Sequence, residues 1–218
     1  ANAAAIKAFL VNRVGDFGFA LGIFACFVLF DTVHFDGIFS AVQSKLDAKM
    51  VFLGHEFHAL TLICLLLFIG AMGKSAQFGL HTWLPDAYTE APAPVAAMLA
   101  GVLETVAVYT VLRSKALVDQ ALPPQFTGNL LLTFGFVSFV VASLFILLQH
   151  NYKRLFAYSS IEHMGLAMLG FGVGGLVGTF GGLFHLLNHA LAKALAFFVA
   201  GNIHRRYDSL EIDQVRGL

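Results

Sequence analysis

The sequence predicts an all-α protein, a polytopic transmembrane bundle of about six helices that includes one broken helix. Composition indicates the membrane, because 58% of the 218 residues are hydrophobic and only 12% are charged, unlike an average soluble domain. Patterning indicates the helices, because the apolar residues form segments close to the ~20 residues that cross a bilayer. The formal net charge is zero, so nothing indicates a nucleic-acid partner.

Six apolar segments are separated by polar or by proline- and glycine-rich connections. We expect them at about residues 14–30, 57–84, 95–112, 126–148, 155–173 and 183–203. The longest connection, residues 31–56, fits a short amphipathic helix at the membrane surface. If the six segments alternate across the membrane, seven lysines and arginines lie on the side of the N-terminus and four on the other side. This excess predicts that both termini are cytoplasmic. The seven are Lys7, Arg13, Lys153, Arg154, Arg205, Arg206 and Arg216, and the four are Lys45, Lys49, Arg113 and Lys115.

The first segment carries one acid, Asp16, near its start. Arg13 precedes it by three residues, so the two side chains are expected to pair at the membrane interface. The fourth segment, residues 126–148, has no ionisable side chain. We expect it to serve as scaffold.

The second segment, residues 57–84, is too long for one straight crossing. Glycines predict a break between Gly70 and Gly73. Broken helices at membrane depth are tolerated where the freed backbone faces protein or a water-filled cavity, which suits a transport pathway. We therefore expect a leucine at Gly73 to impair function more than a leucine at Gly135 in the fourth segment.

Lys74 follows enough apolar helix to lie inside the bilayer, where a charge costs ~2.5–3.5 kcal/mol. Such a lysine is usually functional, and the alternative is a shorter helix from which its side chain reaches the interface. Gln77 and His81 follow at i+3 and i+7 from Lys74, so we expect them on the same helical face. The sequence predicts a polar stripe, with Lys74 as the base and the other two as supporting groups.

Glu104 lies near the middle of the third segment and needs a partner, because a lone acid in a bilayer is costly. A proline-rich connection makes the second and third segments antiparallel neighbours. Lys74 lies 11 residues before Pro85, and Glu104 lies 10 residues after Pro94, so both are expected at the same depth. We expect them to pair if the helices are suitably rotated; otherwise Glu104 meets Lys193 or a helix outside this chain.

The sixth segment carries His185, His189 and Lys193 at i, i+4 and i+8. They stack on one helical face ~6 Å apart, where single waters could connect them. Histidine suits proton transfer because its unperturbed pKa is about 6.5. Glu162 and His163 of the fifth segment supply a further acid and base. The alternatives are histidines that only bridge helices and a metal pair, which we do not expect because Lys193 would repel a cation.

Four ordered motifs resemble the antiporter-like membrane subunits of respiratory complex I. They are NRVGDF at 12–17, GKSAQ with TWLPD over 73–86, KRLFAYSSI at 153–161 and HxxxHAxxKA at 185–194. Energy-converting hydrogenases and multisubunit sodium/proton antiporters contain subunits of the same family. Up to about Asp86 the chain is more similar to complex I subunit L. From Tyr88 onward it is more similar to the membrane subunits of formate-hydrogenlyase-type hydrogenases.

The resemblance implies part of a larger bundle of inverted repeats, with broken helices and a central line of charged groups. Residues 1–218 then form one transmembrane domain, about 1–115 from the end of one repeat and about 123–218 from the start of the next. Lys74 matches the lysine of the first broken helix, and His185, His189 and Lys193 match the polar face of the corresponding helix in the second repeat. The chain departs from the L-type pattern at Ala100, where the family has histidine.

The resemblance also implies the function. We expect a proton-translocating, non-redox subunit of a complex I-like NADH–quinone oxidoreductase in a bacterial inner membrane or an equivalent energy-transducing membrane. The alternatives are a membrane subunit of an energy-converting hydrogenase, a sodium/proton antiporter subunit and a structural anchor. No cofactor or metal is expected on this chain. NADH, flavin, iron–sulfur clusters and quinone, or a hydrogenase metal centre, would belong to partner membrane and peripheral subunits.

Overall fold

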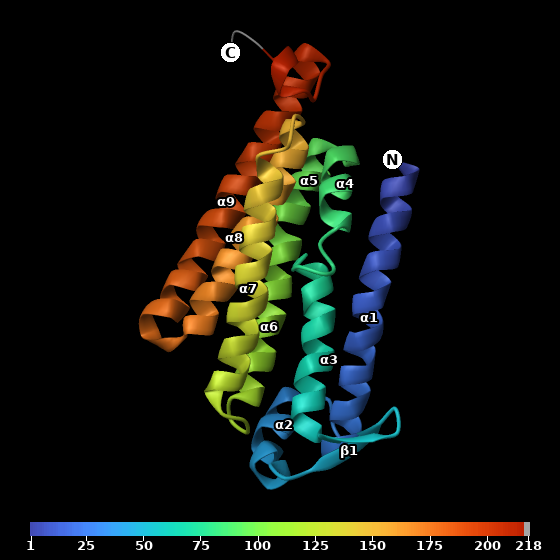
Figure 1. The fold of residues 1–218 in the computed structure, drawn as a ribbon, viewed down its shortest axis with the longest axis vertical. Helices are drawn as coiled ribbons and strands as arrows, with labels where there is room; N and C mark the ends of the chain where they lie inside the picture. The colour runs from blue at the N-terminus through green and yellow to red at the C-terminus, as the bar shows by residue number, and fades with distance from the viewer. Residues whose placement is uncertain (216–218) are drawn as a thin grey trace.

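The computed structural model describes residues 1–215 and consists of long helices that lie side by side along one axis (Figure 1). Arg216, which entered the charge comparison, lies outside the described residues. Both ends of the described chain lie at the same end of the bundle (Figure 1). The helices are α1 (Asn2–Phe30), α2 (Phe35–Ala41), α3 (Ala59–Lys74), α4 (Trp83–Glu90), α5 (Ala93–Met98), α6 (Glu104–Val118), α7 (Pro124–Ile146), α8 (Tyr152–Val173) and α9 (Gly175–Tyr207).

The predicted class, an all-α membrane bundle, is confirmed. Each predicted segment corresponds to helix in the structure. The first is α1, the second comprises α3 and α4, the third comprises α5 and α6, and the last three are α7, α8 and α9. Within the described residues, four helical stretches are long and apolar enough to cross a membrane, and α3 is a shorter apolar helix. The four stretches are α1, residues 93–118, residues 125–146 and α9.

The long connection after α1 contains the expected short helix, α2, and also an unpredicted β-hairpin. Strands β1 (Lys49–Phe52) and β2 (His55–His58) pair antiparallel. Leu53 and Gly54 join them, both with positive φ, of 52° and 83°. Two-residue hairpin turns of this kind usually carry Asn-Gly or Asp-Gly. The sequence therefore lacked the usual turn signal.

The broken helix is confirmed, but the break lies later than predicted. Residues 75–82 separate α3 from α4 about halfway along the bundle (Figure 1). Gly70 does not break the helix; instead it lets α1 approach, since a Cβ there would lie 2.4 Å from Phe19 Cβ. The backbone leaves the helical path at Ala76 and Gly79, which have positive φ of 49° and 100°.

Side chains satisfy part of the backbone that the break exposes. The indole Nε1 of Trp83 donates to the Gly73 carbonyl at 3.0 Å. The Phe78 amide donates to Ser138 Oγ of α7 at 2.8 Å. An irregular backbone at this depth is tolerated because neighbouring protein groups replace its lost hydrogen bonds.

The fourth segment is more than a neutral scaffold, because α7 touches α8 through glycines. A Cβ on Gly135 would lie 2.8 Å from the Gly165 carbonyl oxygen, and one on Gly165 would lie 2.7 Å from the Gly135 oxygen. A Cβ on Gly73 would meet Gly15 Cα at an ordinary 3.4 Å. Gly135 is therefore a close-contact position itself, and the expectation that a leucine at Gly73 impairs function more than a leucine at Gly135 stays a prediction.

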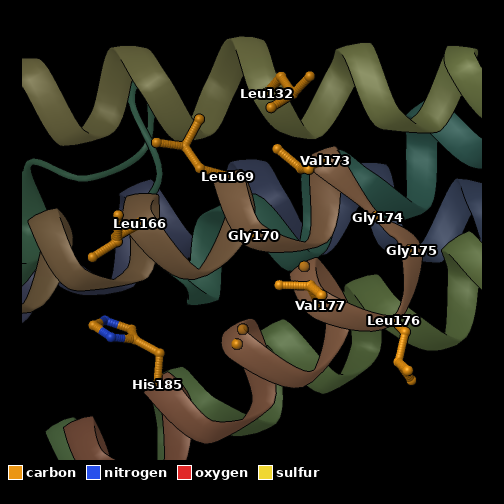
Figure 2. A pocket seen from close by; sticks show the side chains of 13 residues that line it. Leu132, Leu166, Leu169, Gly170, Val173, Gly174, Gly175, Leu176, Val177 and His185 are labelled. Carbon is orange, nitrogen blue, oxygen red and sulfur yellow. The ribbon is translucent and has the colours of Figure 1, made fainter.

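The glycine-rich region after α8 forms a turn much tighter than predicted. Gly174 alone separates the two helices, and Gly174 and Gly175 both have positive φ, of 69° and 65°. Figure 2 shows this turn beside an apolar hollow of about 740 Å³ between α7, α8 and α9. Glycines beyond the turn belong to α9, where Gly182 lets Phe171 pack closely. They permit helix contact rather than separating the two helices.

We predict that Gly135→Ala lowers thermal stability in detergent by ~1–3 kcal/mol, because the added methyl group meets backbone atoms of α8. Gly73→Ala is the matched control and should change stability much less. Equal melting temperatures for the two variants would contradict the assigned role of the α7–α8 glycine contact.

Candidate functional site

Lys74 lies at the end of α3 and pairs with an acid on α1. Its Nζ is 3.1 Å from Asp16 Oδ1, with about two-fifths of each side chain exposed. Arg13 Nη1 lies farther from the same carboxylate, at 3.9 Å. The predicted Arg13–Asp16 contact is present, but Lys74 is the closer cation. Lys74 is the last residue of α3, and α3 ends partway along the bundle because α4 continues the crossing (Figure 1).

The Lys74–Asp16 pair faces a groove between α1 and α6. Two hollows of about 320 and 300 Å³ lie along it, and both are lined by Asp16, Lys74 and Leu103. The pair is therefore reachable from the side of the bundle that α1 and α6 border. An additional acid or a water could meet Lys74 there.

Glu104 is wholly buried and does not pair with Lys74. Tyr88 of α4 donates its hydroxyl proton to Glu104 Oε1. His189 Nε2 of α9 lies 3.5 Å from Glu104 Oε2. Lys74 and Glu104 therefore do not pair, and within residues 1–215 Lys193 forms no ion pair with Glu104 either. Helix rotation explains this, because α6 turns Glu104 toward α4 and α9 whereas Lys74 points toward α1.

The histidines form a line that uses two helices. His163 Nδ1 of α8 lies 3.2 Å from His185 Nε2 of α9. The His163 and His189 rings are 5.5 Å apart between centroids. In Figure 2, His185 projects from α9 into the space beside α8. Together with Glu104, these three side chains form what we call the histidine–glutamate line, which runs from the apolar hollow to the centre of the bundle.

Lys193 lies on the predicted polar face of α9, and its side chain is buried. Its ammonium donates to the Phe156 carbonyl oxygen of α8 at 3.2 Å. Glu162, the second candidate acid, accepts from Ser143 Oγ of α7 at 2.7 Å. Neighbouring residues on a helix point in different directions, so Glu162 faces α7 while His163 faces α9.

Gln77 and His81 do not share a helical face with Lys74, so that prediction is wrong. The helix ends at Lys74, and both residues lie in the irregular connection. Gln77 is fully buried and donates from Nε2 to the Ser75 carbonyl at 3.3 Å. His81 stacks on Phe78, with ring centroids 5.7 Å apart.

The sequence analysis missed the side chains that fix α4. Asp86 accepts from Lys7 at 2.7 Å and lies 2.9 Å from Arg154 Nη1. Lys153 is buried, and its ammonium donates to the carbonyls of Thr89 and Ala91 at 2.8 and 2.7 Å. A cation at the C-terminal end of a helix is favourable because the last carbonyls point toward it. The sequence signal for these contacts was the position of Asp86 beside the proline-rich connection.

Two side chains of the histidine–glutamate line carry buried polar atoms that lack a hydrogen bond within the described residues. Glu104 Oε2 and both ring nitrogens of His189 are buried and make no hydrogen bond with the residues that the structure describes. Buried polar atoms are normally hydrogen-bonded, so atoms like these deserve a functional explanation. Within residues 1–215, no three His, Cys, Asp or Glu side chains are arranged to hold a metal ion.

Comparison with known proteins gives a consistent result. Residues 1–218 match the family described as NADH:quinone oxidoreductase/Mrp antiporter, TM. NADH-ubiquinone oxidoreductase chain 5 of Triticum aestivum is 45% identical over 100% of this chain and 32% of its own length. NADH-quinone oxidoreductase subunit L of Rhodobacter capsulatus is 43% identical over 100% of this chain and 30% of its own length. The chain thus spans about a third of these relatives.

Two solved structures share the fold. A chain of the membrane-bound sulfane sulfur reductase, an archaeal respiratory membrane complex, superposes with a TM-score of 0.85 at 26% identity, over 100% of this chain and 42% of its own. A chain of the Mrp complex from Dietzia sp. DQ12-45-1b superposes with a TM-score of 0.78 at 25% identity, over 94% of this chain and 22% of its own.

The observed partners predict which double-mutant cycle is coupled. Lys74→Met and Asp16→Leu should interact by ~0.5–1 kcal/mol in thermal stability, because Lys74 is the closer cation of Asp16 and the pair is about two-fifths exposed. Lys74→Met and Glu104→Leu should be additive within ~0.5 kcal/mol, because the structure gives them different partners. Coupling in the second cycle and none in the first would overturn the assignment of partners.

Proposed function

This chain belongs to the family of NADH:quinone oxidoreductase and Mrp antiporter membrane subunits, and from that membership we propose that it conducts protons as part of a larger energy-transducing membrane complex. Redox chemistry in that complex would belong to partner subunits. The parent most consistent with the relatives' names is a complex I-type NADH–quinone oxidoreductase.

The histidine–glutamate line is the observation that carries this proposal. A buried carboxyl lies within 3.5 Å of a buried imidazole, and two further imidazoles continue the line. Imidazole both accepts and donates a proton near neutral pH, and a carboxyl next to it can take the proton over. Such a line offers a proton a succession of sites where apolar side chains offer none.

Lys74 is the proposed switching base of this subunit. Its ammonium pairs with Asp16. It also lines the groove between α1 and α6, where a further acid could approach it. Lys193 is the proposed base at the far end of the α9 face. The proposed roles of Gln77, His81 and Glu162 are limited to supporting the backbone or the helices that they contact.

We also propose the arrangement of the chain in its parent. Helices α1 to α6 would end one inverted repeat and α7 to α9 would begin the next, so that the Glu104–His189 contact joins the two. The termini would lie on the cytoplasmic side, as the positive charges favour. Partner membrane and peripheral subunits and the lipid bilayer would surround this part.

A sodium/proton antiporter subunit is the second candidate, favoured by the superposition on the Mrp complex. Both candidates use the same lysines. Transport by the complete assembly that depends on sodium concentration would favour the antiporter, whereas proton pumping that is indifferent to sodium would favour the complex I-type subunit.

We predict that Lys74→Ala in the complete parent protein lowers proton pumping by ~tenfold or more, because a proton-transfer group is lost. Pumping is measured in membrane vesicles that contain equal amounts of assembled complex. Lys49→Ala is the control, because Lys49 lies on the exposed hairpin, where it pairs with Glu56 at 3.3 Å. Near-normal pumping by Lys74→Ala would contradict the role of Lys74 and favour a structural anchor.

A further inference from the structure

Tyr88 has no role in the function proposed so far, yet it is one of the largest fully buried side chains of the described chain. It lies on α4, the second half of the broken helix. Its hydroxyl is its only polar side-chain group, and it donates to Glu104 Oε1. A buried hydroxyl needs such a partner, but many carbonyl oxygens could have supplied one. The choice of an acid is therefore informative.

The position of Tyr88 is held from two directions. Its ring packs edge-on against Phe197 of α9, with centroids 5.2 Å apart and planes at 88°. The backbone of α4 is held by Asp86, whose carboxylate meets Lys7 and Arg154, and by the Lys153 ammonium at its C-terminal end. The hydroxyl is therefore presented to Glu104 by a part of the protein that has little freedom to move.

Glu104 follows an unusual backbone element, which directs its side chain. Residues Leu99–Leu103 form a π-helical turn between α5 and α6. The extra residue in such a turn changes the register of the helix, and π-helical turns are frequent at functional sites. Small residues on both helices allow α9 to come close: a Cβ on Gly101 would lie 3.2 Å from the Ala190 carbonyl oxygen.

The two carboxyl oxygens of Glu104 consequently differ. Oε1 is bound by Tyr88, whereas Oε2 makes no hydrogen bond within the described residues and faces His189 Nε2 at 3.5 Å. A carboxyl held through one oxygen keeps the other in a constant direction. Without the Tyr88 hydroxyl, rotation about the last side-chain bond could exchange the two oxygens or turn both away from the imidazole.

We propose that Tyr88 is a positioning residue that holds Glu104 so that Oε2 alone faces His189. This inference rests on the proposed role of Glu104 and His189 in proton transfer and extends it to a residue of the broken helix. Proton transfer between donor and acceptor needs their heavy atoms within hydrogen-bond reach, so orientation at this contact governs its rate. Through Tyr88, α4 orients Glu104 of the histidine–glutamate line, although Lys74 at the end of α3 does not contact that line.

The test is Tyr88→Phe in the complete parent protein, within its assembled complex. The infrared absorption of Glu104, whether as carboxyl or carboxylate, is identified as the band that Glu104→Gln removes. We expect Tyr88→Phe to shift this band and to lower pumping about tenfold, the change that loss of one buried hydrogen bond produces in a rate.

Tyr158→Phe is the matched control. Tyr158 is a buried tyrosine that stacks on Phe145 with centroids 5.3 Å apart, and its hydroxyl makes no hydrogen bond within the described residues. The control should leave both band and pumping unchanged. An unshifted Glu104 band in Tyr88→Phe, or an equal shift in Tyr158→Phe, would overturn the role of Tyr88. Normal pumping by Glu104→Gln would instead contradict the proposed function of Glu104, while the band position would still decide the role of Tyr88.

Discussion

The contact between Glu104 and His189 is the interaction around which the rest of the structure is arranged. Two ionisable groups are buried among apolar helices, where an isolated charge is costly, so each requires the other close by. Their approach depends on small residues beside them, since a Cβ at Gly101 would lie 3.2 Å from the Ala190 carbonyl oxygen. The π-helical turn then directs the carboxyl toward α9. Packing at these positions therefore serves chemistry as well as stability.

The break between α3 and α4 gives one crossing two separate tasks. Its first half ends at Lys74, which faces α1 and the open groove. Its second half carries Tyr88, which faces the interior and holds Glu104. A continuous helix would present both residues with fixed helical periodicity, whereas the irregular connection sets the two directions independently. This gives a physical reason for a broken helix at this place in the bundle.

Much of the fold could be predicted from the sequence, because apolar length and proline or glycine position are local signals. They located the six segments and the broken helix. The partners of the charged groups could not be predicted, because partners depend on the rotation of each helix about its axis. Lys74 thus met Asp16 rather than Glu104, and His163 inserted beside His185 on another helix. Gln77 lies beyond the end of α3 rather than on its face, because glycine positions do not determine at which residue a helix ends.

The central claim is that protons pass through the Glu104–His189 contact. The most direct measurement is the number of protons pumped per electron pair by the complete parent complex, reconstituted in vesicles with His189→Gln. Glutamine keeps a polar side chain at this buried position but cannot relay a proton as imidazole does. The account predicts a lower ratio of protons to electrons while electron transfer continues in the assembled complex. An unchanged ratio would contradict it.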